Sequence, residues 1–448
     1  MSRPASVIRC AGCGYQASPD NPYPFRCPRA GTGDVDHVMA RVLDTARLSF
    51  PDGRETNPFL RYRGLLHSYH VALARDLPDA GYCELVSALD GAVARVDGHG
   101  FKITPLFRSD ALSEALEFTA GGGVWVKDET GNVSGSHKGR HLMGVLLHLA
   151  VMERTGLLRP ADRRELAISS CGNAALAAAV AARAGGWRLT VLVPPDAHPA
   201  VVERLRALHA NVVVCRREPG VPGDPAYLRL RELLGQGALP FTTQGNENGL
   251  CIEGGETLGY ELVTGLRERG GGLDHLIIQV GGGALASACI QALREAADLG
   301  ALARLPRIHT VQTFGAHPLE RAWELARAQL PDNPSPDGVR AAMVEAAAHR
   351  SLYMWPWEEE PKSVATGILD DETYDWRAVV EGMLLTGGRP LVVSEDLLVE
   401  ANQLAADATG IAVDPTGSSG LAGLLELRRT GVAAAGERVG VLFTGARR

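Results

Sequence analysis

Lysine is the rarest amino acid in this sequence. Of the 45 basic residues only four are lysine, at Lys102, Lys127, Lys138 and Lys362, and the other 41 are arginine. Arginine can fill nearly every electrostatic role at a surface, but its guanidinium stays protonated and cannot form a Schiff base. If this protein carries out carbonyl–imine chemistry, only four residues can perform it.

Other absences exclude whole classes of function. No apolar run reaches the roughly 18–20 residues that a membrane-spanning helix needs. The net charge of −7 leaves no basic excess to neutralise nucleic-acid phosphates. The first residues, MSRPASVIRCAGCG, contain no apolar signal core, and Cys215 and Cys289 lie in an expected apolar strand and helix, which suits a reducing compartment. We therefore expect a cytoplasmic protein without a membrane or nucleic-acid partner.

Short apolar segments alternate with helical patterns along most of the chain, and 448 residues are too many for one core. A helical connector is expected at 58–89 and long loops at 331–338 and 355–377. The expected strands are 124–129, 165–169, 188–194, 211–215, 275–280, 307–314, 390–394 and 438–444. The expected helices are 138–155, 174–184, 199–209, 226–235, 284–297, 317–329, 395–409 and 418–430. This alternation indicates an α/β protein with parallel sheets covered by helices on both faces.

In such proteins ligands bind where a strand ends in a turn of small residues before a helix. The segment GNVSGSHKGRH (131–141) is one such turn, and Lys138 falls at the start of its helix. A cation there opposes the helix dipole, which favours a functional role. The alternative is a solvated surface lysine.

The segment ISSCGNAAL (168–176) is a second turn of this kind. Its backbone amides could hold a carboxylate or a phosphate. Asn173 could instead simply cap the following helix.

The segment QVGGGALAS (279–287) has three consecutive glycines, which allow close approach of an anion to the backbone. It also fits the dinucleotide pattern G-x-G-x-x-A, which requires an acidic residue at the end of the next strand. Thr313 and Phe314 stand there, so a nicotinamide cofactor is disfavoured. In the fourth segment, VLFTGARR (441–448), the strand ends at Thr444, whose hydroxyl would point into the ligand crevice.

Taken together and in order, these segments resemble those of one family. VKDETGNVSGSHKGRH resembles the lysine segment of the type II pyridoxal-phosphate enzymes, the tryptophan synthase β-like superfamily. SCGN resembles their asparagine loop, GGGAL their phosphate loop, and LFTG the strand whose hydroxyl faces the pyridine nitrogen. ITPL (103–106) and NGLCIEGGETLGYEL (248–262) match two further segments, so the resemblance covers about 100–448. Thr444 and the N-terminal Cys-x-x-Cys favour the threonine synthase group.

The resemblance implies a role for each residue. Lys138 would bear pyridoxal 5′-phosphate as a Schiff base and act as the general base and acid. Asn173 would bind the ring 3′ oxygen, Thr444 would face the pyridine nitrogen, and the substrate would contact Ser170, Cys171 and His137. The phosphate would be held by the backbone of Gly281, Gly282, Gly283 and Ala284.

The same resemblance implies two doubly wound α/β domains with mostly parallel sheets, in a homodimer. We expect a zinc-ribbon-like module at 1–45, a connector and the start of the large domain at 46–138, a small domain at 139–240, and the large cofactor-binding domain at 241–448.

The N-terminal segment carries Cys10, Cys13 and Cys27 in the manner of a zinc knuckle, with His37 as the nearest fourth ligand. A structural zinc is therefore expected in addition to the pyridoxal phosphate. The alternative is a degenerate ribbon that is held by packing alone.

The expected reaction is elimination or replacement at Cβ or Cγ of an amino acid, with a phosphate ester such as O-phosphohomoserine as the threonine synthase-like substrate. The alternatives are a serine/threonine dehydratase, a cysteate-synthase-like enzyme or a specialised β-replacement enzyme. A catalytically silent ligand sensor on the same fold is the non-enzyme alternative. His137 and Gly139 depart from the family pattern beside the lysine, which leaves substrate and reaction open.

Overall fold

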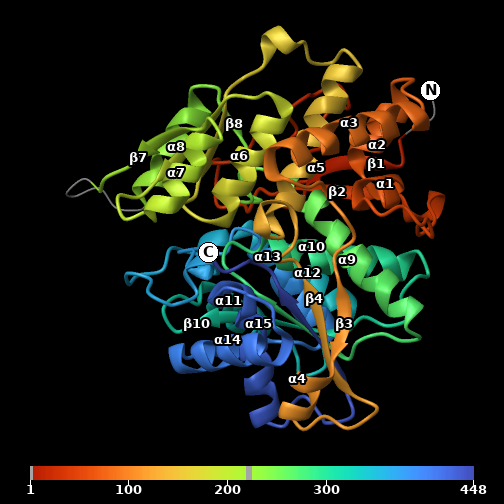
Figure 1. Ribbon diagram of the computed structural model, residues 1–448, viewed down its shortest axis with the longest axis vertical. Coiled ribbons are helices and arrows are strands. Elements are labelled where there is room, and N and C mark those ends of the chain that lie inside the picture. The colour runs from red at the N-terminus through yellow and green to blue at the C-terminus, as the bar shows by residue number, and fades with distance from the viewer. Residues whose placement is uncertain (1–3, 218–223) are drawn as a thin grey trace. The chain divides into compact units, whose positions relative to one another are not determined.

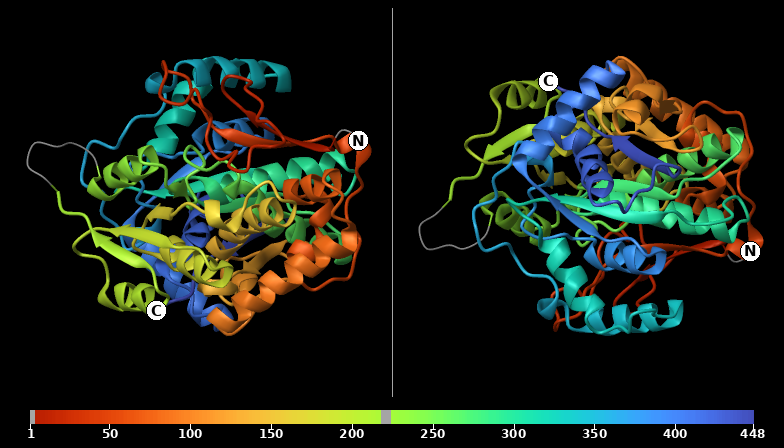
Figure 2. Two further views of the ribbon diagram at one scale, coloured as in Figure 1. Left: turned by 90° about the horizontal axis from the view of Figure 1, so that it is seen from above. Right: turned by 90° about the horizontal axis from the view of Figure 1, so that it is seen from below.

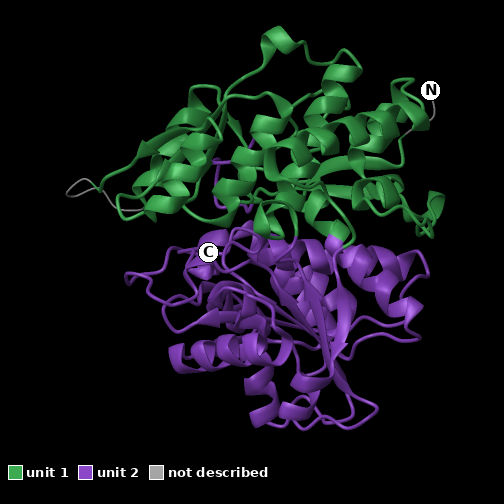
Figure 3. Cartoon of the chain, in the orientation of Figure 1, with its two compact units in different colours: residues 1–28, 37–103, 132–257 green, residues 29–36, 104–131, 258–448 purple. Residues whose placement is uncertain are grey.

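The computed structural model describes residues 4–217 and 224–448 of the chain (Figure 1). The chain divides into two compact units (Figure 3). Unit 1 comprises residues 1–28, 37–103 and 132–257, and unit 2 comprises 29–36, 104–131 and 258–448. Among the helices of the described residues, none combines the length and the apolar composition needed to cross a membrane.

A six-stranded sheet with the strand order β11-β10-β9-β12-β4-β3 forms the centre of unit 2. All neighbouring strands in it are parallel except β3, which runs antiparallel to β4 at one edge. The strands are β3 (Leu106–Ser109), β4 (Gly123–Asp128), β9 (His275–Gln279), β10 (Arg307–Thr313), β11 (Pro390–Val393) and β12 (Arg438–Phe443). Because the central strands β9 and β12 are neighbours, their carboxyl ends meet at the middle of one edge.

Helices cover both faces of this sheet. Val311 of β10 lies within van der Waals reach of Gly423 on α15, whereas the hydroxyl of the preceding Thr310 contacts the sulfur of Met383 on α13. Since neighbouring residues of a strand point to opposite faces, α15 and α13 lie on opposite faces. Helix α14 packs on α15, and α10, α11 and α12 pack on α13.

The helices of unit 2 are α4 (Asp110–Ala115), α10 (Ala284–Asp298), α11 (Pro318–Arg327), α12 (Pro336–Ala348), α13 (Trp376–Thr386), α14 (Glu395–Thr409) and α15 (Pro415–Arg429), with short 3-10 turns at Arg350–Leu352 and Thr366–Ile368. Helix α9 (Cys251–Glu268) begins in unit 1 and continues into unit 2. Residues 29–36, part of the red N-terminal segment in Figure 2, also belong to unit 2. There the Asp36 amide donates to the carbonyl of Ala347 at the end of α12.

Unit 1 contains a parallel four-stranded sheet with the order β7-β6-β5-β8. Ala167 and Leu192 pack against Ala226 and Leu230 of α8, and the alternate strand residues face the side on which α6 contacts β5 and β6. The strands are β5 (Leu166–Ser169), β6 (Leu189–Val193), β7 (Asn211–Val214) and β8 (Leu239–Pro240), and the flanking helices are α6 (Asn173–Gly185), α7 (Pro199–Ala207) and α8 (Pro225–Gly235).

The N-terminal part of unit 1 begins with an antiparallel pair, β1 (Ser6–Cys10) and β2 (Met39–Leu43). Helix α2 contacts β1 and α5, and α3 contacts α5 and α6. The helices here are α1 (Pro58–Arg61), α2 (His67–Ala74), α3 (Asp79–Asp97) and α5 (Lys138–Arg154), with 3-10 turns at Thr45–Arg47, Arg63–Leu65, Val133–Gly135 and Pro160–Asp162.

The α/β class with mainly parallel sheets is confirmed. The two expected loops are confirmed over most of their length, but α12 already begins at Pro336 and α13 at Trp376, so the last residues of both segments are helical. The letters Ser335-Pro336 that suggested a loop form a helix start, because the Ser335 hydroxyl accepts from the Gly338 amide and proline tolerates the first turn.

The compact units also divide the chain differently from the expected domains 1–45, 46–138, 139–240 and 241–448. Residues 104–131 join unit 2, because β3 and β4 extend the sheet of β12. Residues 1–28 and 37–103 join unit 1 rather than forming a separate module and a connector, because β1 and the helices α2 and α3 pack on α5 and α6 or on each other.

Candidate functional site

Lys138 is the first residue of α5, and the turn before it is tightly held. The Ser134 amide, in a left-handed backbone conformation (φ 59°), donates to the Asp97 carboxylate at 2.8 Å. A side chain at Gly139 would clash with the carbonyl of Val133, at 2.8 Å from a Cβ placed there. The fold of this turn therefore favours glycine at position 139.

The Lys138 ammonium group is half-buried and donates a hydrogen bond of 3.3 Å to the hydroxyl of Thr243, a buried residue in the loop after β8. His137, the N-cap residue of α5, and His141 on α5 lie on either side of it in sequence, with their rings edge to face at 5.7 Å. Burial, reinforced by the positive charge of Lys138, lowers the pKa of His141 to about 3, so this ring is neutral at physiological pH. A neutral hydroxyl thus helps to fix the Lys138 amine, beside a neutral imidazole.

The other three lysines have different environments. Lys127 is 1% exposed and is held by the Glu261 carboxylate at 2.5 Å and by the Thr104 carbonyl at 2.8 Å. Lys362 is 77% exposed and pairs with Glu360, and Lys102 is exposed. Of the four candidates, Lys138 alone combines partial burial with a position at a strand-turn-helix junction.

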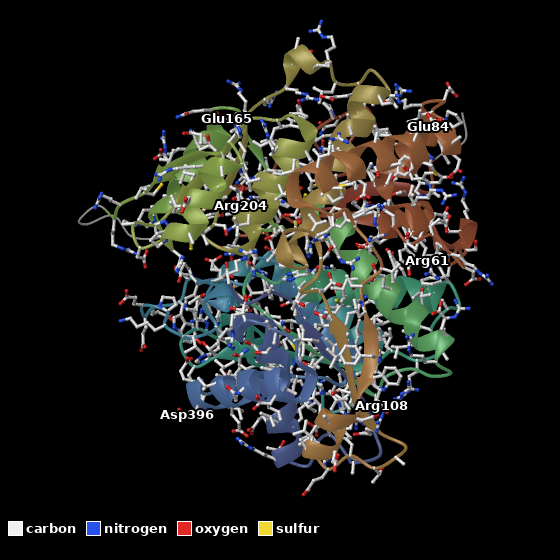
Figure 4. All side chains as sticks on the ribbon, viewed as in Figure 1. Arg61, Glu84, Arg108, Glu165, Arg204 and Asp396 are labelled. Atoms are coloured by element: carbon white, nitrogen blue, oxygen red, sulfur yellow. The ribbon has the colours of Figure 1, made fainter. Side chains whose placement is uncertain are left out.

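Arginine supplies the cations elsewhere. Figure 4 labels Arg204 of α7 and Arg61 of α1 in unit 1 and Arg108 of β3 in unit 2. Arg204 is exposed, and Arg61 and Arg108 are half-buried. This distribution agrees with the argument from composition that lysine is not needed for surface electrostatics in this chain.

The turn after β5 contains the predicted substrate residues. Ser170 accepts a hydrogen bond of 3.3 Å from the Gly172 amide, and Cys171 is exposed. Gly172 is the N-cap of α6 and Asn173 is its first residue, without a capping hydrogen bond from a side chain. Asn173 therefore does not serve as the helix cap, the alternative that the sequence left open.

In unit 2 the glycine loop 281–283 joins β9 to α10, and Gly283 adopts a left-handed conformation (φ 99°). The carbonyl of Gly281 accepts from the Thr373 hydroxyl at 3.0 Å, and that of Gly282 accepts from the Asp375 amide at 3.1 Å. In a planar trans peptide the carbonyl and the next N–H point in opposite directions. The amides of Gly282 and Gly283 therefore point away from Thr373 and Asp375.

The amides of Gly282 and Gly283 adjoin the free N–H groups at the start of α10, where an anion is favoured. Within the described residues none of the amides of Gly281, Gly282, Gly283 and Ala284 donates a hydrogen bond. The loop therefore fits a phosphate group.

Glycine is required at these positions for a second reason, which the sequence did not reveal. A Cβ at Gly282 would lie 2.8 Å from the Tyr374 ring, and one at Gly283 would lie 2.9 Å from the Thr373 side chain. A Cβ at Gly281 would collide with the Asp370 carboxylate. The segment 368–375, which we expected only as a loop over the sheet, thus fixes the conformation of the phosphate loop.

Thr444 directly follows β12, is 2% exposed and accepts a hydrogen bond of 2.7 Å from the side-chain amide of Gln279. Gln279 is the last residue of β9, next to β12 in the sheet. Its signal in the sequence is a single polar residue at the end of the apolar strand HLIIQ. The signal for Thr243 is weaker, because it lies within the polar run TTQGNENG.

The predicted zinc ligands come together in unit 1. The ligand atoms of Cys10, Cys13, Cys27 and His37 all lie within 4.8 Å of one another. The Cys13 and Cys27 sulfurs are 3.7 Å apart, and the Cys10 sulfur is 3.5 Å from Nδ1 of His37. With Zn–S of about 2.3 Å and Zn–N of about 2.0–2.1 Å, a tetrahedral site has edges of about 3.8 and 3.6 Å.

Comparison with known proteins gives the family of the chain. A family model described as "Pyridoxal-phosphate dependent enzyme" matches residues 99–445. Threonine synthase of Methanocaldococcus jannaschii is 24% identical over 342 residues, 76% of this chain and 74% of that protein. A serine dehydratase-like protein of Mus musculus is 32% identical over 298 residues, 63% of this chain and 82% of that protein. The crystal structure of a T.th. threonine deaminase has a TM-score of 0.56 at 23% identity and covers 81% of this chain and 98% of that one.

Proposed function

The chain belongs to the pyridoxal-phosphate dependent enzymes, and we propose that it is a threonine synthase-like lyase or synthase that eliminates or replaces a substituent at Cβ or Cγ of an amino acid. The proposed substrate is a phosphate-ester amino acid such as O-phosphohomoserine. The similarity to the M. jannaschii threonine synthase over 76% of this chain supports the choice of substrate class.

The observation that carries the reaction type is Thr444. Pyridoxal phosphate, when bound, supplies an electron sink for charge at the Cα of an amino acid. A neutral hydroxyl facing the pyridine nitrogen does not enforce its protonation as a carboxylate would. Charge at Cα is then relieved best by expulsion of a leaving group, so elimination and replacement are favoured over transamination.

The residues divide the remaining tasks. Lys138 would hold the cofactor and afterwards move the proton at Cα, with Thr243 fixing its amine. The amides of the glycine loop and of Ala284 would bind the phosphate, and Asn173 the ring oxygen. Ser170, Cys171 and the adjoining amides would bind the substrate carboxylate, with His137 beside the substrate.

Two measurements test this function. Borohydride reduction followed by peptide mapping is expected to find the pyridoxyl group on Lys138, and a label on Lys102, Lys127 or Lys362 would contradict the assignment. Absorption spectroscopy during titration with phosphohomoserine, phosphoserine, serine, threonine and cysteine identifies the substrate class. Efficient transamination without elimination or replacement on any of them would overturn the reaction type.

A serine/threonine dehydratase is the second candidate. It is favoured by the 32% identity to the mouse serine dehydratase-like protein, which exceeds the 24% to the archaeal threonine synthase. The same titration separates the two, because a dehydratase would turn over serine or threonine without a phosphate ester.

The proposal includes one structural Zn²⁺ bound by Cys10, Cys13, Cys27 and His37. It is supported by distances between the ligand atoms that match the edges of a tetrahedral zinc site, and by the burial of three of the four ligands. Elemental analysis of protein prepared in metal-free buffer is expected to give about one zinc per chain. A Cys10→Ser/Cys13→Ser variant should contain no zinc. Wild-type protein without zinc would contradict the metal site and would favour the alternative of a degenerate ribbon held by packing alone.

A cytoplasmic homodimer completes the proposal, on the basis of the family resemblance and of the composition. Sedimentation equilibrium of the purified protein is expected to give twice the chain mass of 47.5 kDa. A monomer at micromolar concentration would contradict it.

A further inference from the structure

Arg350 joins two segments of unit 2 that are far apart in the sequence. Its Nη2 group donates to the Glu372 carboxylate, and its Nε lies 3.4 Å from the carboxylate of Asp36. Only 26% of the Arg350 side chain, 17% of Glu372 and 4% of Asp36 are exposed. Because a guanidinium stays protonated and presents its N–H groups in one plane, it can hold both carboxylates in fixed positions.

The backbone at Arg350 is itself held by the N-terminal segment. The Arg350 amide donates to the Asp34 carbonyl at 2.9 Å. The Ser351 amide and hydroxyl donate to the Asp34 carboxylate at 2.9 and 2.7 Å. The Nη1 group of Arg350 donates to the Met354 carbonyl at 3.2 Å, which closes the turn. Arg350 therefore holds Glu372 from a fixed position.

Glu372 directly precedes the residues that orient the phosphate loop. The Thr373 hydroxyl donates to the Gly281 carbonyl at 3.0 Å, and the Asp375 amide donates to the Gly282 carbonyl at 3.1 Å. These two hydrogen bonds turn the loop carbonyls towards this segment and the amides that follow them away from it. A shift of Glu372 would therefore be passed on to the amides that are proposed to bind the phosphate.

A second contact between the same two segments carries no charge. The rings of Tyr353 and Trp376 are stacked with their centroids 5.8 Å apart and their planes within 10° of parallel. Trp376 is the first residue of α13 and is fully buried. Because this contact does not involve the guanidinium, the segment should remain folded when Arg350 is replaced, and the change should be confined to the position of Glu372.

We propose that Arg350 is a positioning residue for the cofactor phosphate, which acts through Glu372 on the conformation of the glycine loop. The inference rests on the proposed function and deepens it, because that loop is the proposed phosphate site. In the proposed function the glycine loop binds only the phosphate, and other residues bind the ring and the aldehyde carbon. The contribution of Arg350 is therefore specific to the phosphate group.

The test compares pyridoxal phosphate with pyridoxal, which lacks the phosphate. Dissociation constants of both are measured by fluorescence titration of the full-length protein after removal of its cofactor. In Arg350→Gln the dissociation constant of pyridoxal phosphate should rise about tenfold or more, because a hydrogen bond to a charged group is lost. That of pyridoxal should stay within about twofold. An equal loss for both compounds, or an unchanged value for pyridoxal phosphate, would overturn the inference.

Arg321 provides a matched control. It pairs with the Glu358 carboxylate at 3.0 Å and donates to the Trp355 carbonyl at 2.6 Å, so its partners are of the same kinds as those of Arg350. Within the described residues it makes no hydrogen bond or ion pair with Glu372. Arg321→Gln should therefore leave both dissociation constants as in the wild type. A selective loss of pyridoxal phosphate in this variant as well would contradict the specific role of Arg350.

A second variant keeps the test decisive if Arg350→Gln does not fold. Glu372→Ala removes the same ion pair from its other side and should give the same selective loss, and an unchanged affinity for pyridoxal phosphate would overturn the inference. The double variant should bind no more weakly than the weaker single variant, because both residues act through one contact. Losses that multiply would contradict this. Wild-type protein that binds pyridoxal phosphate no more tightly than pyridoxal would instead refute the proposed phosphate site.

Discussion

The two units place many of their buried polar side chains in different kinds of element. In unit 2 the strands of the sheet themselves carry buried polar side chains, among them Lys127, His275 and Gln312, and Gln279 and Thr444 stand at the carboxyl ends of the central strands. In unit 1 polar groups are spread through the helices, including fully buried Arg140, His141 and His148. Burial of a polar residue therefore does not by itself mark the site in either unit. Gln279 and Thr444 are candidates because they lie at the carboxyl ends of neighbouring central strands, where α/β proteins bind ligands.

The buried lysine of unit 2 and the half-buried lysine of unit 1 differ in the groups that hold them. Lys127 of unit 2 neutralises the buried carboxylate of Glu261 and also lies 3.9 Å from Glu129. Lys138 of unit 1 donates to a neutral hydroxyl, that of Thr243. Covalent attachment of a cofactor suits Lys138 better, because converting Lys127 to a neutral amine would leave a buried carboxylate without its counter-charge.

Loss of the metal should produce the largest difference in stability between the two units. Removing zinc with a chelator, or with Cys10→Ser/Cys13→Ser, should lower the unfolding free energy of unit 1 by about 5 kcal/mol or more, since structural zinc contributes on the order of 10 kcal/mol to small modules. Amide hydrogen exchange followed by peptide mass spectrometry measures this by segment. Protection in β1, β2 and α2 should fall while that in β9 and β12 persists.

The matched control is Cys289→Ser, a buried cysteine on α10 outside the metal cluster, which should not change the zinc content. Equal loss of protection in both units after chelation would show that the metal does not act on unit 1 alone.

Substitution of Lys138 should reduce activity but not stability, whereas substitution of Lys127 should reduce stability. Lys138→Ala should reduce turnover about 10³-fold or more and leave the thermal midpoint nearly unchanged, because it removes the proton-transferring group. Lys127→Met should cost about 3–5 kcal/mol of stability, since it leaves Glu261 buried without its ammonium partner. Steady-state rates and urea unfolding, measured for both variants, show whether activity and stability are lost separately. A stable, folded Lys127→Met would refute the structural role of Lys127.

Acid should act on unit 1 before unit 2. Burial lowers the pKa of His141 to about 3 and of His148 to about 4, and it also lowers the pKa of His67 and His70. In unit 2 the corresponding described residue is His309, whose pKa burial lowers to about 3. Each ring is neutral when folded and becomes protonated on unfolding.

The stability that these neutral histidines contribute is therefore fully present above the pKa of about 6.5 that they have in the unfolded chain. It falls as the pH drops from there towards their lower pKa values in the folded protein. Each histidine contributes a slope of up to about 1.4 kcal/mol per pH unit, so unit 1 should lose protection in hydrogen exchange at a higher pH than unit 2. A common midpoint, or an earlier loss in unit 2, would contradict this.

The smallest effect is expected at Thr243. Thr243→Val removes one acceptor of the Lys138 amine, worth about 0.5–1.5 kcal/mol, and should lower kcat roughly 2- to 10-fold with little change in KM. Thr243→Ser keeps the hydroxyl and should restore the rate. Equal losses in both variants would indicate a packing role for the Thr243 methyl group instead.

Most strands and helices could be predicted because each depends on a local pattern. The helix expected at 395–409 matches α14 residue for residue, since Ser394 caps it and Gly410 ends it in a left-handed conformation. The start of α12 was missed because Pro and Asp occur both in loops and in helix first turns. No helix was expected at 251–268, where α9 forms. Helix α5 packs so closely on its first turns that a Cβ at Gly254 would collide with the Arg140 carbonyl, and one at Gly144 would lie 2.8 Å from Gly254. The glycines are therefore required by packing rather than by the local sequence.

The sequence by itself determined the residue types and the order of the site segments, because Schiff-base chemistry requires lysine and anion binding at a strand-helix turn requires small residues. It therefore predicted Lys138, the glycine loop and Thr444 as candidate site residues, together with three cysteines and a histidine as candidate metal ligands. Only the tertiary structure decided how these groups are held. Gln279 reaches Thr444 across 165 positions of sequence, and Thr373 and Asp375 turn the carbonyls of the glycine loop. Such partners have no local pattern, because any polar residue that folding brings to within about 3 Å can make the same hydrogen bond.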